Sequence, residues 1–274
     1  MDWLQALQDL RSAGLPSVLA TVTEARGHAP REAGAKMLVG AESTWGSIGG
    51  GNLEATVIDR ARALLRSGST VPESLPFPLN EHAVTEHGQQ CCGGVVSVLL
   101  EPFPARATVA IFGMGHVGHE LARILSRLPI QLHPVDSRAD QLNPAHLADI
   151  LAGPAEVQPK HSAVPDTTLA GLPPGSHVFI MTHDHAEDFL LCDAALRRGN
   201  LGSVGLIGSS AKWSRFRQKL QAEGHSSEAI DTISCPIGLP GLPGKDPAAI
   251  AVSAAASLLP ALSKHLALSK HLAI

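Results

Sequence analysis

The chain has 274 residues with a formal net charge of −4, and only 17% of its residues are charged. This balance argues against a surface that binds nucleic acid, and an aromatic content of 3% leaves few side chains on which bases can stack. Tyrosine is absent, which excludes mechanisms that use a tyrosine general acid. The length suits one large domain or two small ones.

The start of the chain lacks a basic segment followed by an apolar one, so we expect no signal peptide. The most apolar run, residues 247–262, contains Pro260 and is short for a bilayer, so we expect no membrane contact. The four cysteines do not have the spacing of a secreted disulfide framework. These features predict a cytoplasmic protein with free thiols.

The first part of the chain is predicted to be a small, β-rich α+β domain. Residues 2–12 have the leucine spacing of an amphipathic helix, whereas 17–22 and 36–39 have the apolar and β-branched residues of strands. Three prolines predict a loop over residues 71–80.

Two glycine turns in this part are candidates for ligand binding. Gly49, Gly50 and Gly51 directly precede a helix for which Asn52 is a good N-cap, and such backbone amides can form an anion nest. The equally weighted alternative is a flexible corner that lets the backbone turn sharply.

The second turn, residues 92–94, leads into an apolar strand. A thiol on such a turn is accessible, and nearby amide dipoles favour its thiolate form, so Cys92 is a candidate functional residue together with Gly93 and Gly94. The alternative is a small buried side chain, which is the usual role of cysteine.

Residues 101–106 contain two prolines and separate this β-rich part from a βαβ pattern. We therefore expect two domains, 1–103 and 104–274. The second is predicted to be Rossmann-like, with a parallel sheet.

The strongest motif is a glycine fingerprint between an apolar strand and an amphipathic helix. Gly113, Gly115 and Gly118, with His116 among them, form the GxGxxG pattern whose amides and helix N-terminus face a pyrophosphate. The acidic residue expected about 20 positions later is Asp136. The alternative is a tight strand–helix junction that binds nothing.

The segment after the fingerprint helix is harder to interpret. Pro134 falls within the second apolar strand, and we expect that strand to leave the ladder near its end. Residues 141–176 have no clear periodicity and carry no assignment.

Polar residues also follow the next two apolar strands. His183, Asp184 and His185 come after one of them, and Gly208 and Ser209 come after the other. Ligands of open parallel sheets bind outside the carboxyl ends of the strands, so we expect these residues to line one crevice with the fingerprint turn.

The histidine cluster has three interpretations. With Asp184 and Asp188, His183 and His185 have the chemistry of a metal site, but no matching third cluster occurs in the sequence. Hydrogen bonding to a ligand is favoured, and capping of the next helix by Asp184 is the simpler alternative.

The basic residues of the helix over 210–223 are expected to form a solvated face, with one phosphate contact as the alternative. They are Lys212, Arg215, Arg217 and Lys219.

Taken together, these motifs resemble the XdhC/CoxI family, the accessory proteins of xanthine dehydrogenase and related molybdenum hydroxylases. Seven motifs occur in order over nearly the whole chain, which is far more specific than the fingerprint alone. They are residues 30–37, 46–54, 92–94, 113–118, 181–185, 205–209 and 235–239.

The resemblance implies a chaperone that is not itself an enzyme. Such a protein binds the molybdenum cofactor (molybdopterin) and protects it while a cysteine desulfurase supplies the terminal sulfido ligand. It then inserts the cofactor into apo-xanthine dehydrogenase or a related molybdenum hydroxylase. The cofactor carries a phosphate, which a glycine turn at a helix N-terminus can hold. A homodimer is expected from the frequency of dimers among soluble proteins.

We therefore expect cofactor contacts from all of these turns, with Cys92 near the metal end, no catalytic residues and no protein-bound metal. A separate nucleotide, NAD(P) among others, is a second candidate ligand for the Rossmann turn. The expected cofactor-binding residues are Gly49, Gly50, Gly51, Asn52, Cys92, Gly93, Gly94, Gly113, Gly115, His116, Gly118, Asp136, His183, Asp184, His185, Gly208 and Ser209.

Two other functions remain open from the sequence. An NAD(P)-dependent oxidoreductase would use the same fingerprint and Asp136, but the missing tyrosine and a first domain without an evident hydride-acceptor site weaken it. A metal-dependent hydrolase built on His183, Asp184 and His185 is weaker still.

Overall fold

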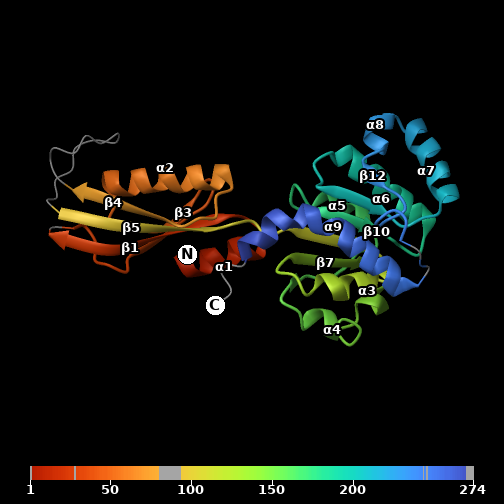
Figure 1. Cartoon of the computed structure of the whole chain (residues 1–274), viewed down its shortest axis with the longest axis horizontal. Coiled ribbons are helices and arrows are strands. Elements are labelled where there is room, and N and C mark those ends of the chain that lie inside the picture. Colours follow the sequence, from red (N-terminus) through yellow and green to blue (C-terminus); the bar gives the residue numbers. More distant parts are fainter. Residues whose placement is uncertain (1, 28, 80–93, 243, 245, 270–274) are drawn as a thin grey trace. The chain divides into compact units, whose positions relative to one another are not determined.

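A computed structural model of the chain describes residues 2–27, 29–79, 94–242, 244 and 246–269 (Figure 1). The chain divides into two compact units, Met1–Arg106 and Ala107–Ile274. The first contains an antiparallel sheet and the second a parallel one. No helix in the described part of the chain is both long and apolar enough to cross a membrane.

The sheet of the first unit has the strand order β3-β2-β1-β5-β4. Alternate strand residues face opposite sides, so the sheet has two apolar faces. Helix α2 covers one face, where Val57 and Ala61 pack against Val18, while α1 covers the other face, where Ala6 packs against Leu19. The elements are α1 (Trp3–Ser12), β1 (Ser17–Gly27), β2 (Lys36–Val39), β3 (Thr44–Gly46), α2 (Gly51–Ser67), β4 (Glu73–Leu79) and β5 (Gly94–Phe103).

The loop predicted over residues 71–80 is wrong, because β4 occupies most of it. Pro76 and Pro78 lie within β4 and pair with Ser97 and Val95 of β5. Proline lacks the N–H that a central strand donates to both neighbours, but β4 is an edge strand with a single neighbour. The prolines therefore mark a sheet edge instead of a loop.

The sheet of the second unit has the order β12-β11-β10-β6-β7-β8, and β9 also pairs with β7. The chain starts at the central strand β6 and adds β7 and β8 on one side. It then returns to the other side of β6 and adds β10, β11 and β12, as in a doubly wound Rossmann sheet. The predicted Rossmann-like fold is confirmed. The strands are β6 (Thr108–Phe112), β7 (Gln131–Asp136), β8 (Glu156–Val157), β9 (Lys160–His161), β10 (His177–Ile180), β11 (Ser203–Leu206) and β12 (Ile233–Ser234).

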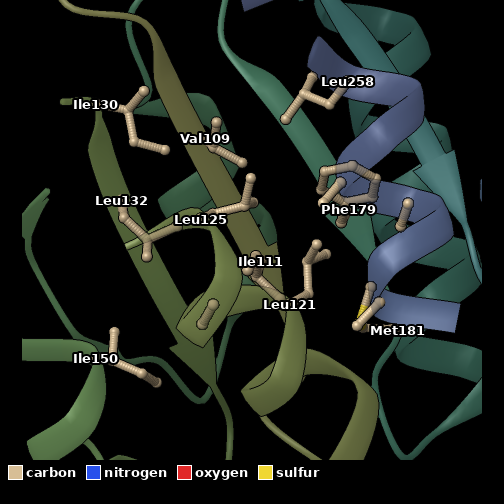
Figure 2. Close-up of a cluster of buried hydrophobic side chains, with 14 of the residues drawn as sticks. Val109, Ile111, Leu121, Leu125, Ile130, Leu132, Ile150, Phe179, Met181 and Leu258 are labelled. Carbon is tan, nitrogen blue, oxygen red and sulfur yellow. The ribbon is translucent and has the colours of Figure 1, made fainter. Parts of the chain in front are cut away.

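Helices cover both faces of this sheet. One face packs against α3, α4 and α9, whose side chains converge with those of β6, β7 and β10 in one apolar cluster (Figure 2). The other face packs against α5, α6, α7 and α8. These helices are α3 (His116–Leu125), α4 (Ala148–Leu151), α5 (Pro165–Ala170), α6 (His185–Arg198), α7 (Ser210–Ala222), α8 (Ser227–Ile230) and α9 (Pro247–Ser269).

The strand that contains Pro134 stays in the ladder with β6 through Val135, contrary to the sequence prediction that it leaves the ladder near its end. Pro134 pairs in register with Ile111, and β7 continues to Asp136. On the other side of β7, β8 pairs with Gln131 and Leu132, and β9 pairs with residues 135 and 136. The break between β8 and β9 therefore falls opposite His133 and Pro134. The unassigned segment 141–176 holds elements of two to six residues, which are too short to show a period.

The side chain of His133 predicts how the stability of this unit depends on pH. Its Nε2 atom is buried without a hydrogen-bond partner in the described structure. Burial lowers the pKa of His133, and the charge of Lys160 lowers it further. The unfolded chain therefore takes up this proton at a higher pH than the folded chain. The free energy of unfolding should decrease as the pH falls below about 6.5, the usual histidine value.

We expect His133→Leu to remove this contribution. The free energy of unfolding of the variant, minus that of the wild type, should therefore be larger at pH 5.5 than at pH 8. Urea unfolding at the two pH values measures the difference. His146→Gln is the control, because that ring is exposed. Equal differences between His133→Leu and the wild type at both pH values would contradict the assignment.

Candidate functional site

The three fingerprint glycines are needed for three different reasons. Gly113 has φ +103°, and a Cβ there would lie 2.2 Å from the carbonyl oxygen of Met181. Gly118 brings α3 close to β6, because its Cβ would lie 2.0 Å from the carbonyl oxygen of Gly113. Gly115 has nothing within 4 Å of its Cβ position and is the N-cap of α3. Only Gly115 therefore leaves open space for a ligand.

Asp136 is held inside the protein by the fingerprint turn and by Arg138. Its Oδ2 accepts a hydrogen bond of 2.7 Å from the backbone N–H of Met114, and its Oδ1 accepts one of 2.8 Å from the N–H of Arg138. The guanidinium of Arg138 adds two bonds of 3.0 Å, from Nε to Oδ1 and from Nη2 to Oδ2. The carboxylate is thus committed to the protein, although a ribose hydroxyl is its usual partner in such folds.

The charge of Asp136 is stable in this position. The residue is only 2% exposed. Burial raises the pKa of its carboxyl group, but the hydrogen bonds from Arg138 and Met114 outweigh this effect and hold the pKa below its usual value. The sequence prediction found Asp136 but missed Arg138. The signal was present, because a basic residue close behind the second strand is typical of sites for phosphorylated ribose.

A cavity of about 1170 Å³ lies beside the fingerprint turn, and we call it the fingerprint cavity. Two predicted site residues, Gly115 and His116, line it together with Arg138. Its other lining residues come from α3, from the segment after β7 and from the start of α9. They are Met114, His119, Glu120, Gln141, Ala145, His146, Ala148, Asp149, Asp246, Pro247 and Ala248.

A second cavity of about 1180 Å³ lies at the carboxyl ends of β10, β11 and β12, and we call it the lysine cavity. Four predicted site residues line it: His183, His185, Gly208 and Ser209. Cationic side chains of α7, the carboxylate of Asp231 that pairs with Arg217, and apolar side chains of the segment after β12 complete its wall. They include Lys212, Trp213, Arg215, Arg217, Cys235, Ile237 and Leu239.

The prediction of one common crevice is therefore wrong. Among the described residues, the two cavities share no lining residue. The first turn of α9 separates them, since residues 246–248 line the fingerprint cavity while Ala249 and Ile250 line the lysine cavity. Gly113, Gly118 and Asp136 line neither and support the turn from within.

Lys212 is the largest departure from the sequence interpretation, which placed it on a solvated face. Its side chain is only 8% exposed and forms an ion pair with Asp188, which is fully buried. The ammonium group also donates a 2.9 Å hydrogen bond to the carbonyl oxygen of Ile207. Asp188 accepts two further bonds of 2.9 Å from the N–H and hydroxyl groups of Thr182. The pair therefore ties the ends of β10 and β11 to α6 and α7.

Asp184 caps α6, as the simpler interpretation held. Its Oδ1 accepts hydrogen bonds from the N–H groups of Ala186 and Glu187, and these bonds lower the pKa of the carboxyl group. His183 and His185 on either side are exposed and line the lysine cavity. No group of three or more His, Cys, Asp or Glu side chains suited to a metal ion occurs in the part of the chain that the structure describes.

Cys235 is the described cysteine that lines the lysine cavity. Its thiol donates to the carbonyl oxygen of Gly208 at 3.8 Å. Burial raises its pKa to about 11, against a smaller lowering by the charge of Lys212. Cys235 is therefore a neutral thiol at pH 7. Cys92 and Gly93 lie outside the described residues, and Gly94 begins β5 in register with Gly27 of β1.

In the first unit, the predicted anion nest already holds a carboxylate of the chain. Oε2 of Glu54 accepts hydrogen bonds from the hydroxyl of Ser47 at 2.7 Å, the N–H of Ile48 at 3.2 Å and the N–H of Gly50 at 3.0 Å. The N-cap of α2 is Gly50, so the prediction of Asn52 as N-cap is wrong. The glycines do supply the nest geometry.

These three glycines have positive φ angles of +132° (Gly49), +74° (Gly50) and +61° (Gly51). Space is open around Gly50 and Gly51, whereas Pro30 lies directly against Gly49. The spacing of Gly50 and Glu54 could have predicted this contact from the sequence. Glu54 lies one helical turn after Gly50, so its carboxylate can reach back to the backbone N–H groups of the glycine turn.

The fold and the fingerprint geometry define the second unit as a Rossmann domain, here joined to an antiparallel α+β unit. Residues 109–258, more than half of the chain, match the family described as the XdhC Rossmann domain. Residues 10–75 match the family described as XdhC and CoxI. The chain belongs to the XdhC family, as its motifs predicted.

Among individual proteins, the chain is similar to the uncharacterized protein YqeB of Escherichia coli K12, with 26% identity over 251 residues. The match covers 91% of this chain but 44% of YqeB, so the chain spans less than half the length of this relative.

Two solved structures are also similar. One, described as a xanthine dehydrogenase (BH1974) from Bacillus halodurans, has a TM-score of 0.48 and 20% identity over 96% of both chains. The other, TcdA (CsdL), has a TM-score of 0.42 and 12% identity over 59% of this chain and 88% of its own.

The different roles of the fingerprint glycines predict different effects of alanine. Gly118→Ala forces α3 away from β6 and should lower the free energy of unfolding by about 1–3 kcal/mol. Gly115→Ala meets no atom within 4 Å and should change it by less than about 1 kcal/mol. Urea unfolding of the two variants tests this order, and a larger loss in Gly115→Ala would contradict it.

The nest in the first unit predicts that Glu54→Gln lowers stability by about 1–2 kcal/mol, because charge-assisted hydrogen bonds become neutral ones. Unfolding followed by circular dichroism measures the loss. Glu42→Gln is the matched control in the same unit, since the Glu42 side chain is exposed. Equal effects of the two substitutions would show that Glu54 does not hold the nest.

Proposed function

We propose that this chain carries the molybdenum cofactor during the maturation of xanthine dehydrogenase or a related molybdenum hydroxylase. Membership of the XdhC family supports the maturation role. The observation that carries the choice of cargo is the lysine cavity, which combines cationic and apolar walls. Molybdopterin has the same two parts, a phosphate and a flat pterin.

The cationic wall suits the phosphate of the cofactor. Arg215 is exposed and Lys212 is buried, and both side chains line the cavity beside the N-terminus of α7. Ser209 caps that helix by accepting a hydrogen bond from the N–H of Lys212. Lys212 gives one N–H to Asp188 and one to Ile207, and its side chain is only 8% exposed, so Arg215 is the more accessible cation for a ligand. Helix amides and cations together favour a bound anion.

The apolar wall suits a flat heterocycle. Trp213 lies on α7, and Ile237 and Leu239 lie on the segment after β12. The cavity volume of about 1180 Å³ is above the usual range of small-molecule pockets, so its size does not exclude a ligand as large as the cofactor. When bound, the cofactor would supply the molybdenum centre that the client enzyme uses. The residues named here bind it, orient its phosphate and exclude water.

The finer parts of the proposal concern partners. We propose that the sulfido ligand is supplied by a cysteine desulfurase while the cofactor is held here, and that the apo-hydroxylase then receives it. Carriage needs no general acid, base or nucleophile, so the chain acts as an accessory protein and not as an enzyme. His183 and His185, which are exposed and line the cavity, serve as hydrogen-bonding groups under this proposal.

The proposal predicts that the protein purified from cells that make molybdopterin retains about one pterin per chain. Acid release and oxidation of the pterin, followed by fluorescence, measures it. Arg215→Gln should lower retention severalfold, because one charge-assisted contact to phosphate is lost. Arg197→Gln is the control, since Arg197 is an exposed arginine outside the cavity.

Protein without pterin from such cells would overturn the proposal. Equal retention by the two arginine variants would remove the lysine cavity as the binding site.

A further inference from the structure

We propose that the fingerprint cavity is a separate nucleotide site, which selects a nucleotide whose ribose carries an additional phosphate. This inference does not depend on the carriage of the molybdenum cofactor. It rests on the way in which Arg138 and Asp136 replace the usual ribose contact.

The fingerprint turn supplies the first half of the site. The first turn of α3 contains no acidic residue, and no side chain caps it. Gly115 and His116 at this N-terminus line the cavity, with no Cβ at Gly115 in the way. Helix N-termini of this kind bind the phosphates that link the parts of a nucleotide.

Asp136 cannot perform the role that its position suggests. In Rossmann sites for an unmodified ribose, the acidic residue after the second strand accepts hydrogen bonds from the ribose hydroxyls. Here both carboxylate oxygens of Asp136 already accept bonds from Met114 and Arg138, and the residue is 2% exposed. A ribose hydroxyl would have to displace one of these buried hydrogen bonds. Contact with Asp136 therefore adds little binding free energy for a nucleotide with an unmodified ribose.

Arg138 provides the opposite preference. Its bonds to Asp136 use Nε and Nη2, which leaves Nη1 for a ligand, and they hold the guanidinium in one orientation. The side chain is 37% exposed, and the residue lines the same cavity as Gly115 and His116. A fixed guanidinium is well suited to a phosphate on the ribose.

The other charged residues of the cavity explain why Arg138 decides the selection. It is the only lysine or arginine among the described lining residues. Glu120 is paired with Arg123, and Asp149 lies 3.6 Å from the ring of His119. Asp246, at the start of α9, opposes any anion in the cavity. Its repulsion increases with the charge of the ligand, so removing it acts in the opposite direction to removing Arg138.

The first turn of α9 separates this cavity from the lysine cavity, so a nucleotide and a second ligand do not compete for the same space. The site is therefore tested on its own, with nucleotides that differ in one phosphate.

Isothermal titration of the purified full chain with three probes tests the selection. The probes are adenosine 5′-monophosphate, adenosine 2′,5′-bisphosphate and adenosine 3′,5′-bisphosphate. We expect at least one bisphosphate to bind about tenfold to a hundredfold more tightly than the monophosphate, as a new charge-assisted contact allows. The two bisphosphates show which ribose position is read. Equal binding of all three probes, or no binding of any, would overturn the proposal.

Variants assign the selection to Arg138. Arg138→Gln should abolish the preference for a bisphosphate, and Arg138→Lys, which keeps the charge beside Asp136, should reduce it severalfold. Asp246→Asn should tighten binding of every probe and keep or increase the preference for a bisphosphate, because the repulsion it removes is larger for the more highly charged probes. If Arg138→Gln fails to fold, Arg138→Lys decides. A full preference in a folded Arg138 variant, or a lost preference in Asp246→Asn, would overturn the assignment.

Discussion

The buried carboxylate of Asp136 is the interaction on which the binding edge of the second unit depends. It joins the fingerprint turn, through Met114, to the segment after β7, through Arg138. A buried charge that loses its partner is costly, so neither connection can be given up alone. The conformation of the turn and the charge at the fingerprint cavity are thus fixed by one group.

On the other face of the sheet, a buried ion pair likewise connects separate elements. Asp188 and Lys212 connect α6 and α7 beneath the lysine cavity. Between the two cavities, the first turn of α9 occupies the carboxyl edge, where a doubly wound sheet usually offers one continuous crevice. Small residues of α9, including Ala251, Ala254 and Ala255, are buried in the cluster shared with α3. The carboxyl edge therefore has two separate cavities in place of one crevice.

How far the sequence predicts this protein depends on the range of each interaction. The fingerprint glycines are predictable, because their backbone angles and close approaches are set within one strand–turn–helix unit. Lys212 was assigned to solvent because its partner Asp188 lies 24 positions earlier, on another helix. Asn52 resembles an N-cap because asparagine is a common residue at that position, but α2 begins earlier and Gly50 is its N-cap. The division of the crevice by α9 is a tertiary feature with no local signal.

The prolines of β4 have a consequence for association. An open strand edge normally offers a row of N–H and C=O groups to which another chain can add a strand. Pro76 and Pro78 lie in the edge strand β4, which has β5 as its single neighbour, and a proline has no N–H to offer to a further strand. That border is a poor template for strand addition, which protects it from aggregation.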